Sequence, residues 1–328
     1  MGLALGLYCL SGICRAEPAD QRPFYTSSQN PFVQIFGLPP AEGGRLLRDH
    51  ELELHLTAGA ANSSAIGSDL QEQVWLDGES YRGLVGLRYG LTDRLRLGID
   101  VPYLFHSGGT FDRIVERFHE ITGLPNSERD RQGTNEVEYS YTLEGTQVYL
   151  VNRSTSGLGD IRLSAAFALA GYDANSRRSV ALHAGLKLPT GDSSSLLGSG
   201  GTDLSLGVAL TDSETFHRQN LVLFVHGGLL ALGESDPKVG SQRDAAGFAT
   251  FGIAWSRWAK FTIKAQLELH SALYDSELEE IGRTAGQLVF GGSLTFSDRI
   301  TWEFAATEDI SVSTTPDIAF QSHLRMRF

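Results

Sequence analysis

The chain has 328 residues, among them 37 Gly, 10 Pro and two Cys, and its formal net charge is -12 at pH 7. The negative charge, together with the lack of a basic patch interleaved with aromatic side chains, argues against a nucleic-acid partner. No run approaches the roughly 18 apolar residues that a spanning helix needs, but a membrane β-barrel exposes only every second residue to lipid and needs no such run.

Residues 1–16 look like a secretory signal peptide. An apolar run over residues 2–13 is followed by Cys14, Arg15 and Ala16, with small residues at the two positions that a signal peptidase reads. Cys9 and Cys14 both lie inside this stretch, so the mature chain would have no thiol for a metal site, a disulfide or a nucleophile. A lipoprotein anchor at Cys14 is the competing interpretation.

Residues 17–45 have no sustained alternation and are broken repeatedly by proline. We expect a periplasmic or lumen-plugging segment here, ahead of a barrel domain that covers residues 46–328.

From residue 46 onward, apolar and polar residues alternate almost continuously. Leu95, Leu97 and Ile99 share one face of a predicted strand, while Arg96 and Asp100 share the other face. The same period recurs over residues 161–169, 180–188, 204–210, 261–269 and 300–304. A soluble sandwich would show the same period, so alternation alone does not decide between the two.

The connections favour the membrane barrel. Short turns are expected near residues 92–93, 172–178, 212–219, 256–257 and 297–298. Longer loops fall between them at residues 62–71, 106–157, 189–201, 233–246, 274–283 and 308–316. Such alternation of short and long connections is typical of outer-membrane barrels. It predicts an all-β, transmembrane, antiparallel up-and-down β-barrel of about 12 strands, or 14 if residues 137–151 add two membrane strands.

The long loop is expected to contain a short helix. Phe111, Ile114, Val115 and Phe118 recur at the spacing of one helix face. This helix could fold inward as a constriction, or it could simply pack on the barrel rim.

The last stretch, residues 317–328, alternates and ends on Phe328. We interpret it as the closing strand. An aromatic end of this kind resembles the signal by which the barrel assembly machinery of Gram-negative bacteria recognises its substrates, so Phe328 is the candidate assembly signal.

The polar faces of the predicted strands supply the candidate lumen and selectivity residues. They are Glu53, His55, Arg94, Arg96, Asp100, Arg162, His183, Lys187, Lys264, Glu268, His270, Glu303, His323 and Arg325. Barrel closure makes the first and last strands neighbours, so His55 and His323 are expected on adjacent strands. Charge pairing across the lumen is the main interpretation of this set; a proton-sensitive or substrate site is a second, and a metal site is not predicted.

Several stretches resemble a known family. They are G-T-F-D-R-I-V-E-R-F-H-E-I-T-G-L-P-N at 109–126, V-W-L-D-G-E at 74–79, L-R-Y-G-L at 87–91 and I-D-V-P-Y at 99–103. The family consists of uncharacterised Gram-negative outer-membrane proteins, known only as a domain of unknown function, and it implies a barrel and a location. The run S-G-L-G-D-I at 156–161 is also similar to a motif in outer-membrane transporter barrels associated with aromatic-compound degradation.

We therefore expect an outer-membrane channel or transporter for passive passage of small solutes in a Gram-negative bacterium. No catalytic motif is present and no cofactor is expected. Lipid and lipopolysaccharide are the expected surroundings, the latter near the acidic residues of the 274–283 loop. The alternatives are a sealed structural or interaction barrel that presents its long loop, and a surface lipid or peptide hydrolase that uses His106 and His119.

Overall fold

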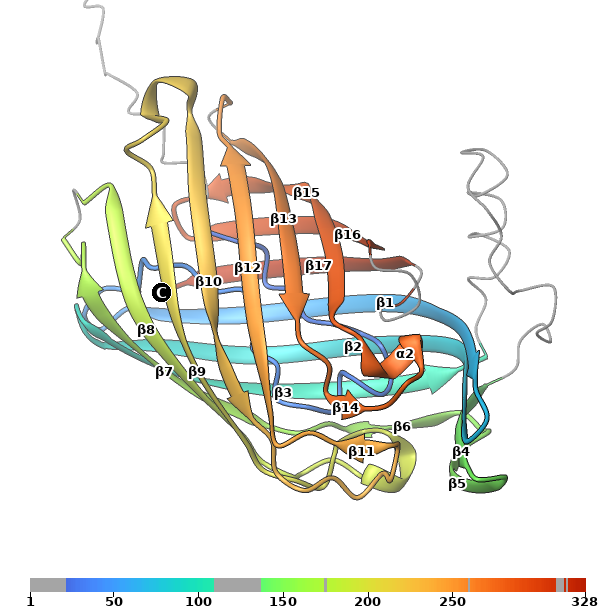
Figure 1. Cartoon of the computed structure of the whole chain (residues 1–328). Coiled ribbons are helices and arrows are strands. Elements are labelled where there is room, and N and C mark those ends of the chain that lie inside the picture. The colour runs from blue at the N-terminus through green and yellow to red at the C-terminus, as the bar shows by residue number, and fades with distance from the viewer. Residues whose placement is uncertain (1–21, 109–136, 174–175, 259, 311–315, 317) are drawn as a thin grey trace, which may run out of the picture.

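The computed structural model describes residues 22–108, 137–173, 176–258, 260–310, 316 and 318–328. Fifteen antiparallel strands form one sheet, and three of them, β4, β5 and β6, lie outside its ring. The remaining twelve close into a barrel, because β1 pairs with β2 on one side and with β17 on the other (Figure 1). In ring order they are β1 (Leu52–Ser68), β2 (Glu72–Thr92), β3 (Leu95–Ser107), β7 (Arg162–Ala170), β8 (Arg178–Lys187), β9 (Asp203–Asp212), β10 (Leu221–Ala231), β12 (Ala245–Trp255), β13 (Phe261–His270), β15 (Ala285–Ser297), β16 (Ile300–Asp309) and β17 (Ile318–Arg327).

The alternation in the sequence places apolar side chains outside the ring and polar side chains inside it. On β3, Leu97 is 43% exposed and Tyr103 is 51% exposed, whereas Arg96 and Asp100 are buried. A water-soluble barrel would have the opposite polarity, so the outer face suits lipid. Within the described residues, no helix is long and apolar enough to cross a membrane.

The twelve strands confirm the predicted count. β4 (Glu138–Leu143) and β5 (Thr146–Val151) form a hairpin whose first strand pairs with residues 72–77 of β2, so neither strand enters the ring. β6 (Thr155–Leu158) pairs with the last part of β3. The expectation of a loop at residues 62–71 was largely wrong, because β1 continues to Ser68 and pairs with β2 over its whole length.

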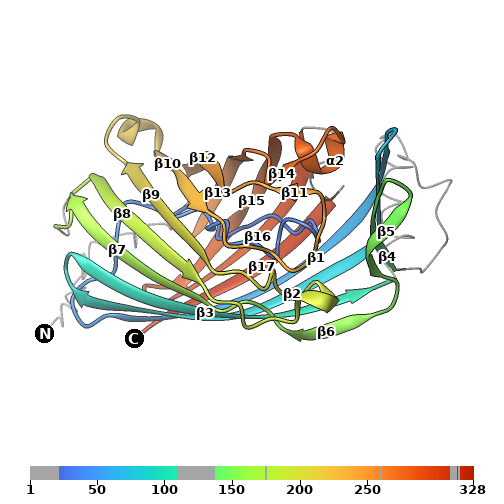
Figure 2. The ribbon, with the colours of Figure 1, turned by 60° about the horizontal axis from the view of Figure 1, so that its bottom comes forward.

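The barrel has a turn end and a loop end. The turn end contains the start of β1 and the end of β17, together with the short connections between strands. The loop end contains the paired short strands β11 (Ser241–Gln242) and β14 (Tyr274–Asp275) and the one-turn helix α2 (Glu279–Gly282) (Figure 2). The 3-10 turn η2 (Ser193–Ser195) also lies at the loop end, whereas a second 3-10 turn, η3 (His217–Gln219), lies at the turn end. The expected helix at Phe111, Ile114, Val115 and Phe118 lies outside the described residues.

Residues 22–48 contact the inner face of the barrel from the turn end to the loop end and back. Arg22 Nη1 lies 2.6 Å from Glu53 Oε2 at the turn end, and Phe32 is fully buried in a cluster at the loop end. On the return, the backbone N–H of Gly37 donates to Asp203 at 2.7 Å and that of Gly44 donates to Thr211 at 3.0 Å. We call residues 22–48 the lumen segment.

Proline explains why the lumen segment adds no strand of its own. Pro23, Pro31, Pro39 and Pro40 lack the backbone N–H that a sheet needs. At the tip, the backbone N–H groups of Val33 and Gln34 both donate to Asn30 O, at 3.0 and 2.8 Å, which turns the chain around. Elsewhere, backbone groups of the segment bond to side chains of the barrel wall, as the N–H of Phe24 does to Gln266.

Candidate functional site

The seam between the first and last strands joins four candidate residues. Nδ1 of His55 lies 3.0 Å from Nε2 of His323, and the two rings stack with centroids 5.2 Å apart. The outer nitrogens of this pair each face a carboxylate: His55 Nε2 lies 2.9 Å from Glu53 Oε1, and His323 Nδ1 lies 2.9 Å from Glu303 Oε2. Barrel closure predicted that these strands are neighbours, and the register then brings the histidines into contact.

Basic residues continue the seam. Arg325 Nη2 donates to Glu303 Oε1 at 2.9 Å, and the Lys264 ammonium also contacts Glu303. At the turn end, Glu53 accepts from Arg22 of the lumen segment and from Arg327 of β17. These groups are of opposite sign, and all but Arg22 and Arg327 are buried, so each charge offsets the cost of burying its partner.

A second pair joins the wall to the lumen segment. Arg88 donates two hydrogen bonds of 2.8 Å to the carboxylate of Asp100, which also accepts from the Tyr25 hydroxyl at 2.6 Å. Gly86 and Gly98 leave room for this ion pair, because a Cβ at Gly86 would lie 2.3 Å from Asp100 Oδ1 and one at Gly98 would lie 2.6 Å from Arg88 Cδ. Arg88 and Tyr25 were not among the sequence candidates, although Arg88 alternates in phase with the inward face of β2.

Nearer the turn end, Arg96 clamps the lumen segment. Its guanidinium donates to both carboxylate oxygens of Glu42, at 3.0 and 3.1 Å. His183 Nε2 lies 3.2 Å from Gly43 O, and the His183 and His226 rings make an edge contact at 5.5 Å. Glu42 and His226 were missed because nothing in the irregular N-terminal sequence shows which wall residues it meets.

Toward the loop end, two more candidates, Lys187 and Glu268, are held by ion pairs and hydrogen bonds. Lys187 Nζ lies 2.7 Å from Asp160 Oδ2 and 3.4 Å from Asp203 Oδ2. Glu268 accepts hydrogen bonds from Thr26 of the lumen segment and from Gln266 and Gln287 of the wall.

Three candidates lie at the ends of the barrel. Arg94 belongs to the turn between β2 and β3, is exposed, and its guanidinium lies 3.9 Å from the ring centroid of Tyr172, so the expectation that it faces the lumen was wrong. A register shift at Gly90–Thr92 ends the pairing of β2 and β3 just before it. His270 is half-buried at the loop end, with Nδ1 2.9 Å from Ser271 O. Phe328 is 66% exposed, and its backbone bonds to that of Leu52; its role in assembly stays a prediction.

The loop end is closed by a hydrophobic cluster, which we call the cap. Phe32 and Phe36 of the lumen segment pack there with Tyr139 of β4, Leu196 and Tyr274, all buried. The Tyr274 hydroxyl donates to Phe32 O at 2.8 Å. The cap thus joins the tip of the lumen segment to three separate external connections.

Asp192 fixes the loop that carries Leu196 into the cap. Its carboxylate accepts from the Ser194 backbone N–H at 3.0 Å and from the Ser195 hydroxyl at 2.7 Å. These hydrogen bonds to the charged form hold the pKa of Asp192 below its usual value. Asp192 thus caps the 3-10 turn η2, which directly precedes Leu196.

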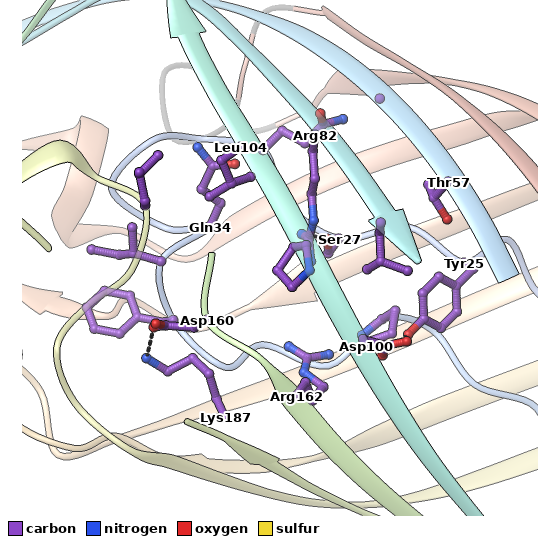
Figure 3. A pocket seen from close by; sticks show the side chains of 18 of the residues that line it. Tyr25, Ser27, Gln34, Thr57, Arg82, Asp100, Leu104, Asp160, Arg162 and Lys187 are labelled. Carbon is purple, nitrogen blue, oxygen red and sulfur yellow. Dashed lines mark hydrogen bonds and ion pairs between the residues drawn. The ribbon is translucent and has the colours of Figure 1, made fainter. Parts of the chain in front are cut away.

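The space left in the lumen is uneven. At the turn end, a cavity of about 450 Å³ is lined by arginines and acidic residues of the wall and of the lumen segment. Farther in, between the lumen segment and β1, β2, β3 and β7, a cavity of about 40 Å³ is lined by Tyr25, Gln34, Arg82 and Arg162 among others (Figure 3). Among the described residues, no three of the His, Cys, Asp and Glu type are arranged to hold a metal ion.

His106, a candidate of the hydrolase alternative, is fully buried. Its Nδ1 lies 2.9 Å from Ser80 Oγ, but its Nε2 lies 3.2 Å from Leu196 O of the loop. A backbone carbonyl thus stands where a catalytic dyad would need an orienting acid, and neither side chain is open to a substrate. His119 lies outside the described residues.

Comparison with known proteins supports the fold. The COG4313 outer membrane channel from Pseudomonas putida F1 is 14% identical and matches with a TM-score of 0.56 over 86% of this chain and 97% of that chain. The KdgM porin (10% identity, TM-score 0.42, 85% of this chain and 99% of that chain) and the P. putida toluene transporter TodX (14%, 0.36, 85% and 87%) are too distant to carry an argument. No curated protein matches. Residues 14–328 match the family model described as "Protein of unknown function (DUF3187)", which confirms the resemblance to an uncharacterised family.

Proposed function

This chain belongs to the DUF3187 family of proteins of unknown function, and we propose that it is an outer-membrane channel for small solutes whose lumen holds its own N-terminal segment. One observation carries the proposal: a closed ring of twelve strands is apolar outside and lined by charged residues inside. A barrel with this polarity places a hydrophilic path across an apolar layer. The turn end would face the periplasm of a Gram-negative bacterium.

The lumen segment would set the width of this path. It crosses the lumen twice and is held mainly by hydrogen bonds and ion pairs, such as Arg96 to Glu42 and Thr26 to Glu268. Water can replace a hydrogen bond between the lumen segment and the wall, whereas it cannot replace apolar packing. The part of the lumen segment held by polar contacts can therefore shift without exposing apolar side chains. Passage is therefore restricted to small solutes, or it requires the segment to move.

The cap supports a second candidate, a sealed barrel with a structural or interaction role. Aromatic residues from the lumen segment and from the loops close the loop end together. If these contacts never open, the barrel conducts nothing and acts through its external surface.

Conductance of the refolded chain from residue 17 onward, in a planar bilayer, separates these candidates. We expect small, stable, salt-dependent steps from this protein and steps several-fold larger from a variant that lacks residues 24–44. Arg177→Gln, at an exposed turn where Arg177 pairs with Glu214, is the matched control and should leave the steps unchanged. A silent full chain with a conducting deletion variant would favour the sealed barrel, and silence from both folded proteins would contradict a channel.

A further inference from the structure

We propose that the cavity between the lumen segment and the wall is a binding site for a small carboxylate anion, with the guanidinium groups of Arg82 and Arg162 as its main ligands. The inference deepens the proposed channel function, since a site on the path would select among solutes. Figure 3 shows the two side chains entering this space from opposite sides, Arg82 from β2 and Arg162 from β7.

Both acidic residues that line the cavity already pair with other cations, Asp100 with Arg88 and Asp160 with Lys187, although Lys187 is shared with Asp203. Asp100 uses its two oxygens for Arg88 and accepts from Tyr25 as well. Asp160 pairs with Lys187 at 2.7 Å and accepts from two backbone N–H groups, those of Gly191 at 2.8 Å and Ser199 at 3.1 Å. Asp100 therefore attracts Arg82 and Arg162 only from beyond hydrogen-bond distance. Four cations beside the cavity, Arg82, Arg88, Arg162 and Lys187, still outnumber the three carboxylates, Asp100, Asp160 and Asp203.

Among the described residues, the hydrogen-bond partners of Arg82 and Arg162 are neutral groups. Arg82 Nη1 donates to Ser27 Oγ at 2.7 Å, and Arg162 Nη2 donates to Leu38 O. Arg162 stands opposite Asp100 in the register of β3 and β7, yet no ion pair within 4.0 Å joins them in the described structure. The two positive charges repel each other, and Asp100 attracts both without hydrogen-bonding to either. A guanidinium has five N–H donors, so each arginine has more donors than its hydrogen bond to Ser27 or Leu38 uses.

Two further side chains offer hydrogen-bond donors. The amide of Gln34 and the hydroxyl of Thr57 are buried in the lining, and in the described part of the chain neither has a hydrogen-bond partner. Buried polar groups without a partner are costly, so these donors favour an occupant that accepts hydrogen bonds. The side-chain oxygens of Gln29 and Gln34, also without a partner among the described residues, favour a donor such as water beside it. A negatively charged acceptor satisfies these donors and the excess positive charge together.

The size of the space narrows the class of ligand. A cavity of about 40 Å³ holds roughly three water molecules. This corresponds to a planar anion such as formate or acetate, and a planar carboxylate accepts the paired N–H groups of a guanidinium in parallel. A larger acid would enter only with its carboxylate and would have to displace part of the lumen segment.

The test is direct binding of acetate to the refolded chain from residue 17 onward, by isothermal titration at low ionic strength. We expect saturable binding that Arg162→Gln and Arg82→Gln each weaken by about tenfold or more, because each removes charge-assisted hydrogen bonds. Arg162→Lys should bind acetate more tightly than Arg162→Gln does, since it keeps the positive charge and loses only the paired N–H donors of the guanidinium. Arg177→Gln is the control and should bind as the unchanged protein does.

The outcomes for this site and for the channel differ. Acetate binding without any bilayer conductance would overturn the channel and keep the site. Conductance without saturable acetate binding, or binding that ignores both Gln variants, would overturn the site and keep the channel. If a Gln variant fails to refold, a crystal structure of the unchanged protein grown with acetate decides, because the absence of acetate from between Arg82 and Arg162 would also overturn the proposal.

Discussion

Adjacent residues of one strand lie in opposite environments, one on the outer face of the barrel and the next in the lumen. Leu97 is half-exposed on the outer face, while its neighbour Arg96 is buried and clamps Glu42 of the lumen segment. The period of two in the sequence fixes which residue belongs to which environment. It does not fix the partner of each inward residue, because that depends on the register and on the lumen segment.

The outer face gives a direct residue-scale prediction. Ile99→Arg should destabilise the barrel in bilayers by about 2–4 kcal/mol, because Ile99 is 37% exposed on the outer face at the fifth residue of β3, closer to the bilayer midplane than Leu97, and a charge there is costly. Unfolding by denaturant in lipid vesicles measures this difference. Leu70→Arg is the matched control: Leu70 lies at an external hairpin tip and is fully exposed, so its replacement should change stability by only a few tenths of a kcal/mol. Equal costs at both positions would contradict the orientation of β3.

At the scale of elements, the hairpin of β4 and β5 is attached to the barrel without being part of it. Its pairing reaches only the loop end of β2, while the ring closes without it. Tyr139, Tyr141 and Val151 from this hairpin are nevertheless buried in the cap. The hairpin therefore contributes to the cap and adds nothing to the membrane-spanning wall.

Deleting residues 138–151, with a short Gly-Ser bridge, should leave a folded barrel and loosen the cap. The ring keeps all of its twelve strands, so the unboiled protein should still migrate as a compact species on a denaturing gel. The tip of the lumen segment loses aromatic contacts, so protease cleavage within residues 30–38 should become faster than in the full chain. If residues 30–38 are cleaved no faster than in the full chain, the other loops alone hold the cap and the prediction is wrong.

The whole molecule is a ring, closed by the pairing of β1 with β17 over ten residue pairs from Glu53 to Asn62. Closure removes the exposed strand edges that would otherwise aggregate or require a partner. It also brings together residues 268 positions apart, His55 and His323.

A cysteine pair across the seam tests ring closure. Ala58 and Ser322 are partners in register on the outer face, and directly opposed residues of antiparallel strands fall within the Cα separation that a disulfide needs. The double variant Ala58→Cys with Ser322→Cys, made from residue 17 onward, should oxidise to a crosslinked monomer that migrates faster when boiled without reductant. Ala58→Cys with Val225→Cys on β10, half-way around the ring, should not crosslink within one molecule. Equal crosslinking of both pairs would argue against the seam.

The sequence by itself determined the barrel, because a period of two with one uncharged face, interrupted by short and long connections in turn, is a local pattern that leaves few folds open. It also indicated the inward charges, and the family match supports the resemblance seen in the motifs. The misplacement of Arg94 and of the loop at residues 62–71 arose at strand ends, where pairing continues or stops for reasons of register and bulges.

Only the tertiary structure decided what fills the lumen and which cations form no ion pair at hydrogen-bond distance among the described residues. Residues 22–48 have no periodicity, since their hydrogen bonds go to wall residues as far as 296 positions away, as between Tyr25 and Gln321. Arg82 and Arg162 are ordinary inward charges in the sequence. They become a candidate anion site because the acidic groups beside them, Asp100 and Asp160, form their ion pairs with other cations, Arg88 and Lys187. Long-range pairing of this kind has no local signature, because each partner is chosen by the shape of the closed ring.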